Sequence, residues 1–195
     1  NSPSSAPTSA DVAFKLPNAD GTSGQAIVTD ASGNLSFAGT GKILQVKQAV
    51  KTDTASSSSA TYADVSGLSV SITPASTSNK ILVECRVCTS GKTDSFQAFK
   101  VFRDSTALGL GTGGTGNQSN ISFGTQGANA TTHQYGVRYG VFSFLDSPSS
   151  TSALTYKIQF ASVYQSYTSY INRPYSTDNS IYNFFPSSSI TVKEV

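Results

Sequence analysis

The chain has 195 residues and a formal net charge of +2, and only 12% of its residues are charged. Met and Trp are absent, and Glu, which helix interiors favour, occurs only at positions 84 and 194. This composition argues against an all-α fold, and the scattered basic residues argue against a nucleic-acid-binding protein. No apolar stretch approaches the roughly 20 residues of a membrane-spanning helix, so we expect no membrane insertion.

The amino-terminal part is rich in turn residues and poor in apolar ones. Its first segment, NSPSSAPTSAD, predicts an extended linker. In the following stretch, LPNADGTSGQAIVTDASGNLSF, the runs AIV and NLSF predict two very short strands that could not be stable alone. We therefore assign residues 1–40 to an extended linker and collar, and residues 41–195 to one larger domain.

In the larger domain, short alternating runs are separated by clusters of Ser, Gly, Asn and Pro. In LTYKIQF, for example, Leu154, Tyr156, Ile158 and Phe160 share one face of a strand. The regular spacing predicts an all-β fold, an antiparallel sandwich of the jelly-roll type. Other strands are expected in KILQVKQAV, LSVSIT, KILVECRVC, FQAFKVFRD and SITVKEV.

One run, YGVFSFL, is apolar on both faces of the predicted strand. Tyr139, Val141 and Leu145 share one side, and Phe142 and Phe144 share the other. A strand that is covered on both faces is either central in the fold or located at a subunit contact. The sequence leaves both alternatives open.

Two long polar stretches, residues 109–134 and 164–188, interrupt the strand pattern, and loops of this length are often functional. The first is Gly-rich and the second is Tyr-rich, and either could form the distal tip of the domain. Tyr has a flat apolar ring and a polar end, which suit contacts with a glycan or a protein. The same rings could instead cover a sheet edge or pack between subunits. The candidate contact residues are Tyr164, Tyr167, Tyr170, Arg173, Tyr175 and Tyr182.

Two motifs that could hold a cofactor or a metal have simpler explanations. Gly109, Gly111 and Gly114 match the G-x-G-x-x-G pattern of dinucleotide sites, but the residues that follow are a poor start for the required helix. The sequence DASGN, Asp30–Asn34, has the oxygen spacing of the start of a calcium loop. Gly41 stands where that loop needs its bidentate acid. We expect a loop and a turn, with no cofactor and no metal.

The residues capable of catalysis do not form a recognisable set. Cys85 and Cys88 are expected on opposite faces of one strand, which prevents a disulfide between them, and we expect reduced structural cysteines. The single histidine, His133, lies in a loop without partners that would complete a zinc site or activate a serine. We therefore predict that the chain is not an enzyme. A carboxylate pair brought together only in the folded protein is left as an alternative.

Three stretches resemble a known family: LPNADGTSGQAIVTDASGNLSF, then LSVSITPASTSNKILVECRV, then RDSTALG followed by LDSPSSTSALTYKIQF. On these stretches the chain resembles the fibre and appendage proteins of tailed bacteriophages. The resemblance is particularly to the carboxy-terminal knob-like domains common among marine phages. The family has no catalytic motif that could be transferred to this chain.

The resemblance implies a homotrimer located on the virion, with a jelly-roll-like head domain and a role in attachment or capsid decoration. In attachment, the expected partner is a glycan or a protein of the host surface. The resemblance also implies contacts with other virion proteins through the amino-terminal segment. In such fibres three chains wrap together, which would bury the apolar residues of the collar between subunits. Those residues are Leu16, Ile27, Val28, Leu35 and Phe37.

Other functions stay open from the sequence. Within the same class, the chain could be a head fibre or a capsid decoration protein. A secreted carbohydrate-binding module would share the sandwich and the aromatic loop but would function as a monomer. A polysaccharide-degrading tailspike is a third alternative, and it would depolymerise glycan of the host envelope.

Overall fold

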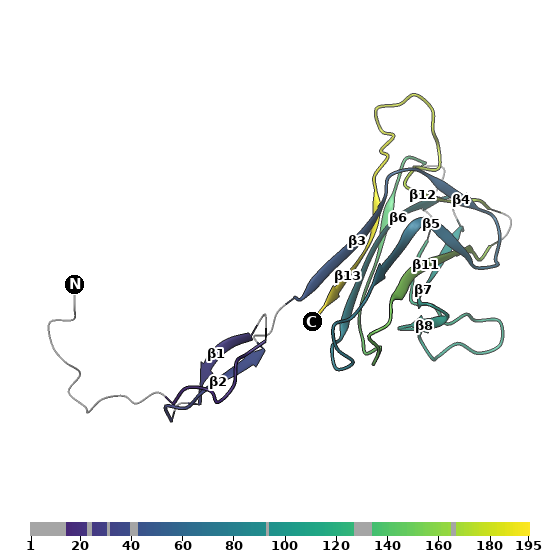
Figure 1. Ribbon diagram of the computed structural model, residues 1–195. Helices are drawn as coiled ribbons and strands as arrows, with labels where there is room; N and C mark the ends of the chain where they lie inside the picture. Colours follow the sequence, from purple (N-terminus) through teal and green to yellow (C-terminus); the bar gives the residue numbers. More distant parts are fainter. Residues whose placement is uncertain are drawn as a thin grey trace. The chain divides into compact units, whose positions relative to one another are not determined.

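A computed structural model describes residues 15–22, 25–30, 32–39, 43–92, 94–126, 134–164 and 167–195. The chain divides into two compact units, Asn1–Lys42 and Ile43–Val195. Every regular element in the described residues is a β-strand, which confirms the prediction of an all-β chain (Figure 1). The described residues contain no helix that could cross a membrane.

The first unit contains two strands, β1 (Gln25–Thr29) and β2 (Leu35–Gly39), which pair antiparallel. The turn between them is organised by Asp30, whose carboxylate accepts hydrogen bonds from the N–H groups of Ser32 (2.8 Å) and Asn34 (3.1 Å). Gly33 has a φ of 87°, a left-handed conformation that favours glycine. The described residues of the DASGN segment, Asp30 and 32–34, therefore belong to a turn, as the sequence predicted.

No described residue of the first unit is buried. Ile27 lies opposite Phe37 in the register, so the two side chains share a face. The space above Gly21 is occupied by the Phe37 ring, which a Cβ at that glycine would approach to 2.5 Å. Leu16 remains 71% exposed and Ile27 57% exposed, whereas Val28, Leu35 and Phe37 are half-buried.

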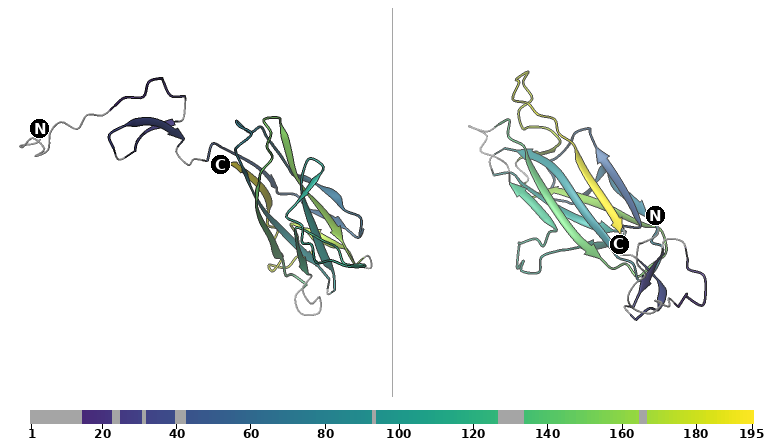
Figure 2. Two further views of the ribbon diagram at one scale, coloured as in Figure 1. Left: turned by 90° about the horizontal axis from the view of Figure 1, so that it is seen from below. Right: turned by 90° about the vertical axis from the view of Figure 1, so that its left-hand side faces the viewer.

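The second unit is a sandwich of two antiparallel sheets (Figures 1 and 2). In the first sheet β6 is central. Along one edge of β6, β13 and then β12 pair with it, and β3 and β4 pair with the outer edges of β13 and β12, respectively. β10 pairs with the other edge of β6. The strands are β3 (Gln45–Lys51), β4 (Ala55–Ser57), β6 (Ile81–Gly91), β10 (Arg138–Asp146), β12 (Ser169–Ile171) and β13 (Ser188–Glu194).

In the second sheet β11 lies between β5 and β7, and β7 pairs on its other edge with both β8 and β9. Its strands are β5 (Ala63–Ile72), β7 (Phe96–Arg103), β8 (Thr106–Leu108), β9 (Phe123–Gln126) and β11 (Leu154–Ser162). β9 and β12 fall inside the two stretches that the sequence predicted as long loops. Both strands are short and their sequences are largely polar, so the sequence does not predict them. They form because neighbouring strands of the sheets supply the backbone hydrogen bonds.

The core lies between the two sheets, and the alternation of the sequence decides which side chains enter it. Tyr156 and Ile158 of β11 are fully buried, and so are Ile81 and Val83 of β6. The residues between them, Lys157 of β11 and Leu82 of β6, are half-buried and point to the other face of each strand, as the period of two predicts. The predicted face of β11, with Leu154, Tyr156, Ile158 and Phe160, is confirmed as buried.

A ladder of stacked rings connects the two sheets along their β9–β10 side. The Phe99 ring stacks on Phe160 at 5.1 Å and on Phe123 at 4.7 Å. The Phe123 ring continues to Phe142 and then to Phe144, with 6.0 Å between centroids at each step. These stacked pairs join the inner face of β10 to the second sheet and add to the stability gained by burying the rings.

The strand that is apolar on both faces, β10, pairs only with β6 in the described part of the chain. It is an edge strand, so the first alternative for this strand, a central position, is wrong. Its inner face packs on the aromatic ladder through Phe142 and Phe144. Its outer face is uncovered, with Val141 69% exposed and Leu145 48% exposed.

A buried charged cluster also joins the two sheets. Asp146, at the end of β10, accepts hydrogen bonds from Arg103 of β7 through both carboxylate oxygens at 2.6 Å. It accepts a third from the Tyr156 hydroxyl at 2.7 Å. Burial and the hydrogen bond to Asp146 both raise the pKa of Tyr156, so the phenol stays protonated. Both carboxylate oxygens of Asp146 are therefore used in hydrogen bonds that stabilise the fold.

Candidate binding surfaces

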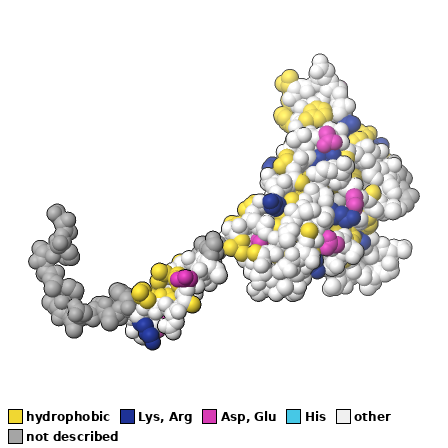
Figure 3. Space-filling model, viewed as in Figure 1, with side chains coloured by type: hydrophobic (Ala, Val, Ile, Leu, Met, Phe, Trp, Pro, Cys, Tyr) yellow, Lys and Arg dark blue, Asp and Glu magenta, His cyan; other side chains and the backbone are white. Residues whose placement is uncertain are grey.

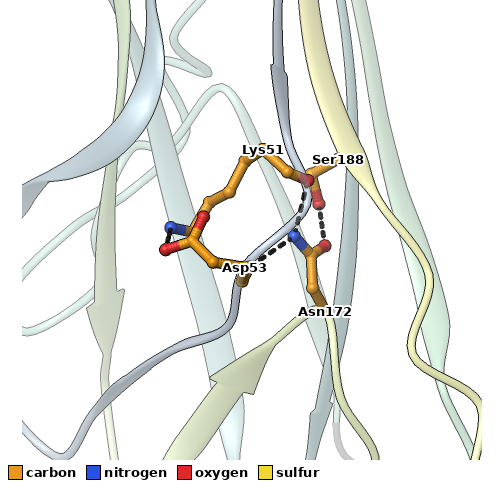
Figure 4. Close-up of polar contacts among 4 residues, drawn as sticks. All are labelled: Lys51, Asp53, Asn172 and Ser188. Carbon is orange, nitrogen blue, oxygen red and sulfur yellow. Dashed lines mark hydrogen bonds and ion pairs between the residues drawn. The ribbon is translucent and has the colours of Figure 1, made fainter.

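The part of the Tyr-rich stretch that follows β12 has a fixed base, which consists of its first and last residues, Asn172 and Ser188 (Figure 4). The Ser188 hydroxyl donates to Asn172 Oδ1 at 2.6 Å, and Asn172 Nδ2 donates to the carbonyls of Lys51 and Asp53 at 2.9 Å each. Asn172 is fully buried and has a φ of 60°, a conformation that Asn tolerates better than most residues. We call residues 172–188 the tip loop.

The base is also bonded to the central strand β6. The Asn172 N–H donates to the Cys88 carbonyl at 3.1 Å, and the Cys88 N–H donates to the Ser188 hydroxyl at 2.9 Å. The loop thereby covers the outer side of β6 at Cys88, which has no exposed surface. A loop closed in this way can present its distal part with little loss of conformational entropy on binding.

Three of the predicted contact residues pack on one another near this base. The Arg173 guanidinium lies 4.3 Å from the centroid of the Tyr170 ring, which lies 6.1 Å from that of Tyr175. Arg173 also donates to the carbonyls of Pro174 and Tyr175 at 3.1 Å each. All three side chains are half-buried. Their rings and charge are engaged within the chain.

Two further predicted residues form a separate pair before β12. The rings of Tyr164 and Tyr167 lie 5.3 Å apart, and Lys92 Nζ lies 4.9 Å from the Tyr167 centroid. Tyr164 is 49% exposed and Tyr167 is half-buried. The six predicted residues are thus divided among this pair, the packed group at the base, and Tyr182 in the distal part of the loop.

The distal part of the tip loop carries a cluster of exposed apolar side chains. It projects from the sandwich at the top of Figure 3, where hydrophobic side chains gather on it. We call this cluster the tip, and its members and exposed fractions are Ile181 (86%), Tyr182 (59%), Phe184 (61%) and Phe185 (59%). Sequence reasoning selected only Tyr182. The signal for the others was the run IYNFF, which is apolar and aromatic within an otherwise polar loop.

Hydrogen bonds and a ring contact fix the tip to a neighbouring segment. The Tyr135 hydroxyl donates to Asp178 Oδ2 at 2.8 Å, and this bond, more than burial, raises the pKa of Tyr135. The Tyr135 ring lies 5.9 Å from the Tyr182 ring. Asn183 donates to the carbonyl and to the carboxylate of Asp178. The apolar tip is therefore held in place by polar contacts beneath it.

A second surface is the outer face of the sheet formed by β3, β13, β6 and β10, seen in the right-hand view of Figure 2. At its β10 side it exposes Val141, Leu145 and Tyr139, and at its β3 side it exposes Val46 and Val50 by about half. These apolar side chains lie on two strands, β10 and β3, which β6 and β13 separate. We call this surface the outer face.

Charged residues lie between the apolar sides of the outer face. Lys193 of β13 pairs with Glu84 of β6 at 2.6 Å, and the Arg86 guanidinium lies 4.0 Å from the Tyr139 centroid. A hollow of about 340 Å³ lies beside them, bordered by Val141 and other residues of β6, β10 and β13. The face is thus apolar at its sides and polar, with paired charges, in the middle.

The two cysteines are both free and buried within β6. Burial, with a smaller contribution from Glu84, raises the pKa of Cys85 to about 12, and burial raises that of Cys88 to about 11. Neither is a thiolate at neutral pH, so neither has the character of a catalytic nucleophile. Within the described ranges no three His, Cys, Asp or Glu side chains could together hold a metal. His133 lies outside the described residues.

No family model and no curated protein matches the chain. A solved structure, "Structure of infectious bursal disease virus Gx strain", contains a chain that is similar to it, with 11% sequence identity and a TM-score of 0.35. The match covers 86% of this chain and 42% of the viral chain. A likeness with so low a TM-score assigns neither a common fold nor a common function. The surfaces described above are therefore interpreted from their own chemistry.

Proposed function

We propose that this chain is a non-enzymatic structural and binding domain of a bacteriophage virion appendage, in which it attaches the particle to the host surface. The sequence resemblance to phage fibre proteins supports the virion location. The observation that carries the attachment role is the tip, where four large apolar side chains are exposed on a loop with a fixed base. Exposed aromatic residues on a preformed support are typical of recognition surfaces.

The proposed assembly is a homotrimer with a jelly-roll-like head domain. Two observations favour self-association: the uncovered outer face of the edge strand β10, and the absence of any buried side chain among the described residues of the first unit. Leu16, Ile27, Val28, Leu35 and Phe37 would be buried against the same residues of other subunits. The amino-terminal segment would contact other virion proteins.

The attachment role is tested by replacing Tyr182, Phe184 and Phe185 together with Ala. We expect adsorption of the labelled chain to responsive strains in a panel of marine bacteria to fall at least tenfold, with an unchanged melting temperature. The control is Leu44→Ala, which removes an exposed apolar side chain outside the tip. Full adsorption by the triple variant would refute the role of the tip.

The trimer is tested by light scattering, which should give three times the 20.3 kDa mass of the chain. Val141→Asp places a charge on the exposed side of β10 and should reduce this mass, because burying an unpaired charge costs several kcal/mol. Ile181→Asp, which changes an exposed aliphatic residue of the tip, should leave the mass unchanged. A monomeric wild-type chain at micromolar concentration would contradict the assembly.

The alternatives are separated by simple measurements. A head fibre or capsid decoration protein would be located on the capsid by imaging of the particle. A secreted carbohydrate-binding module would be monomeric in light scattering. A tailspike would release oligosaccharides from purified host-envelope polysaccharide, whereas we expect this chain to release none.

A further inference from the structure

A groove of about 540 Å³ lies on the outer side of the second sheet, and none of the tip residues lines it. Its floor contains Ala98 of β7 and Gly124 of β9, which are opposite each other in the strand register. A Cβ at Gly124 would come within 3.0 Å of the Ile121 side chain, so the absence of a side chain keeps the groove open. Its volume is within the range of roughly 300 to 1,000 Å³ that is usual for small-ligand sites.

One wall of the groove is formed by the part of the Gly-rich stretch that precedes β9, residues 109–122, and is preformed by hydrogen bonds. Asn120 Oδ1 accepts from the Gly114 N–H at 2.9 Å, and Gln118 Oε1 accepts from the Thr115 N–H at 3.0 Å. At the end of the loop, the Ser122 hydroxyl donates to the Leu108 carbonyl at 2.7 Å. The wall therefore needs little ordering when a ligand binds.

The groove is lined by uncharged side chains alone. Asn117 and Gln126 are exposed at its border, and neither carboxamide has a hydrogen-bond partner within the described part of the chain. Phe96, which pairs with Gln126 in the register, is 42% exposed, and Val163 is 40% exposed. The groove thus combines free donors and acceptors with apolar surface and offers no charge to bind an ionic ligand.

From this combination we propose that the groove binds a neutral glycan. A carboxamide both donates and accepts, so Asn117 and Gln126 match the adjacent hydroxyl groups of a sugar ring. The exposed Phe96 ring matches the apolar C–H face of the sugar. Anionic sugars are disfavoured, because their carboxylate or sulfate would lose water without gaining a cationic partner.

This inference deepens the proposed attachment role, on which it rests for its biological context, by naming a ligand class and a second site. The probe is a printed array of neutral oligosaccharides together with sialylated and sulfated forms of the same backbones. We expect the chain to bind one or more neutral members and to bind their charged forms more weakly. Titration calorimetry with the best neutral binder then gives the affinity.

The variants Asn117→Ala, Gln126→Ala and Phe96→Ala should each weaken this binding at least tenfold with an unchanged melting temperature. The control is Gln48→Ala, which removes an exposed carboxamide from the first sheet. Absence of any neutral binder, preference for the charged forms, or undiminished binding by all three variants would overturn the proposal. If the glycan test fails in one of these ways but the triple variant of the tip still loses adsorption, the attachment role keeps its support and only the groove is removed from it.

Discussion

β1 and β2 in the first unit pair antiparallel over five residues, and β11 and β7 in the second unit pair antiparallel over seven. The difference lies in what the paired faces meet. Tyr156 and Ile158 of β11 face a second sheet and are fully buried, whereas Ile27 of β1 is 57% exposed. Strand pairing without a second layer removes little apolar surface from water, and a two-stranded hairpin is at best marginally stable.

This comparison teaches that the two units depend on different contacts. The sandwich is stabilised within one chain, by its core, its aromatic ladder and the Asp146 cluster. The first unit has no comparable interior in its described residues, which is why we propose that it is completed by other subunits. Substitutions in the two units should therefore have different consequences.

The largest effect is expected from Asp146→Ala, which leaves Arg103 and Tyr156 without their partner. Breaking a buried charged cluster typically costs about 3 to 5 kcal/mol. The free energy of unfolding should fall by this amount in urea titrations. The control is Asp64→Ala at the exposed pair with Lys157, which should cost no more than about 1 kcal/mol. Equal effects of the two variants would contradict the role of Asp146.

The next effect concerns the cysteines of β6. The sequence placed Cys85 and Cys88 on opposite faces of one strand, so the core between the sheets can cover only one of them. Since the base of the tip loop buries Cys88 completely, we expect both Cys85→Ser and Cys88→Ser to cost about 1 to 3 kcal/mol. Thermal unfolding of the two variants measures these losses of stability. A negligible loss for Cys88→Ser would contradict the role of the loop base in burying Cys88.

A smaller effect, dependent on pH, is expected at Glu194. Burial would raise its pKa, but hydrogen bonds from Asn79, Gln45 and the Ala75 N–H lower it below its ordinary value. A lowered folded-state pKa stabilises the fold above the unfolded pKa, and this stabilisation is lost as the pH falls through the folded value.

The stability of the wild-type chain should therefore decline between about pH 5 and pH 3. Glu194→Gln should be about 1 to 2 kcal/mol less stable at pH 7 and should decline less steeply in acid. Parallel pH profiles of the two proteins in urea unfolding would exclude a contribution from Glu194.

The smallest effect on the sandwich is expected from Leu35→Asp and Phe37→Asp in the first unit. Neither residue contributes to the core of the second unit, so its melting temperature should not change. Both variants should nevertheless lose the trimer in light scattering, because the new charge would be buried between subunits. Retention of the trimer by both would refute the collar assignment, and a lower melting temperature would contradict the independence of the two units.

The sequence by itself determined the all-β class, the turn at Asp30 and the side chains that enter the core. These features are local, because the period of two assigns each side chain to a face and because Asp favours hydrogen bonds to its own turn. Leu154, Tyr156, Ile158 and Phe160 could therefore be placed on one buried face without knowledge of any partner strand.

Only the tertiary structure decided what covers each face. It placed β10 at an edge, divided the six predicted Tyr and Arg residues among three locations, and buried Cys88 beneath Asn172 and Ser188. It also brought Asn117 of the Gly-rich loop to the same groove as Gln126 and Val163. Each of these outcomes depends on hydrogen bonds or packing between residues far apart in the chain, for which the periodicity of a single strand carries no signal.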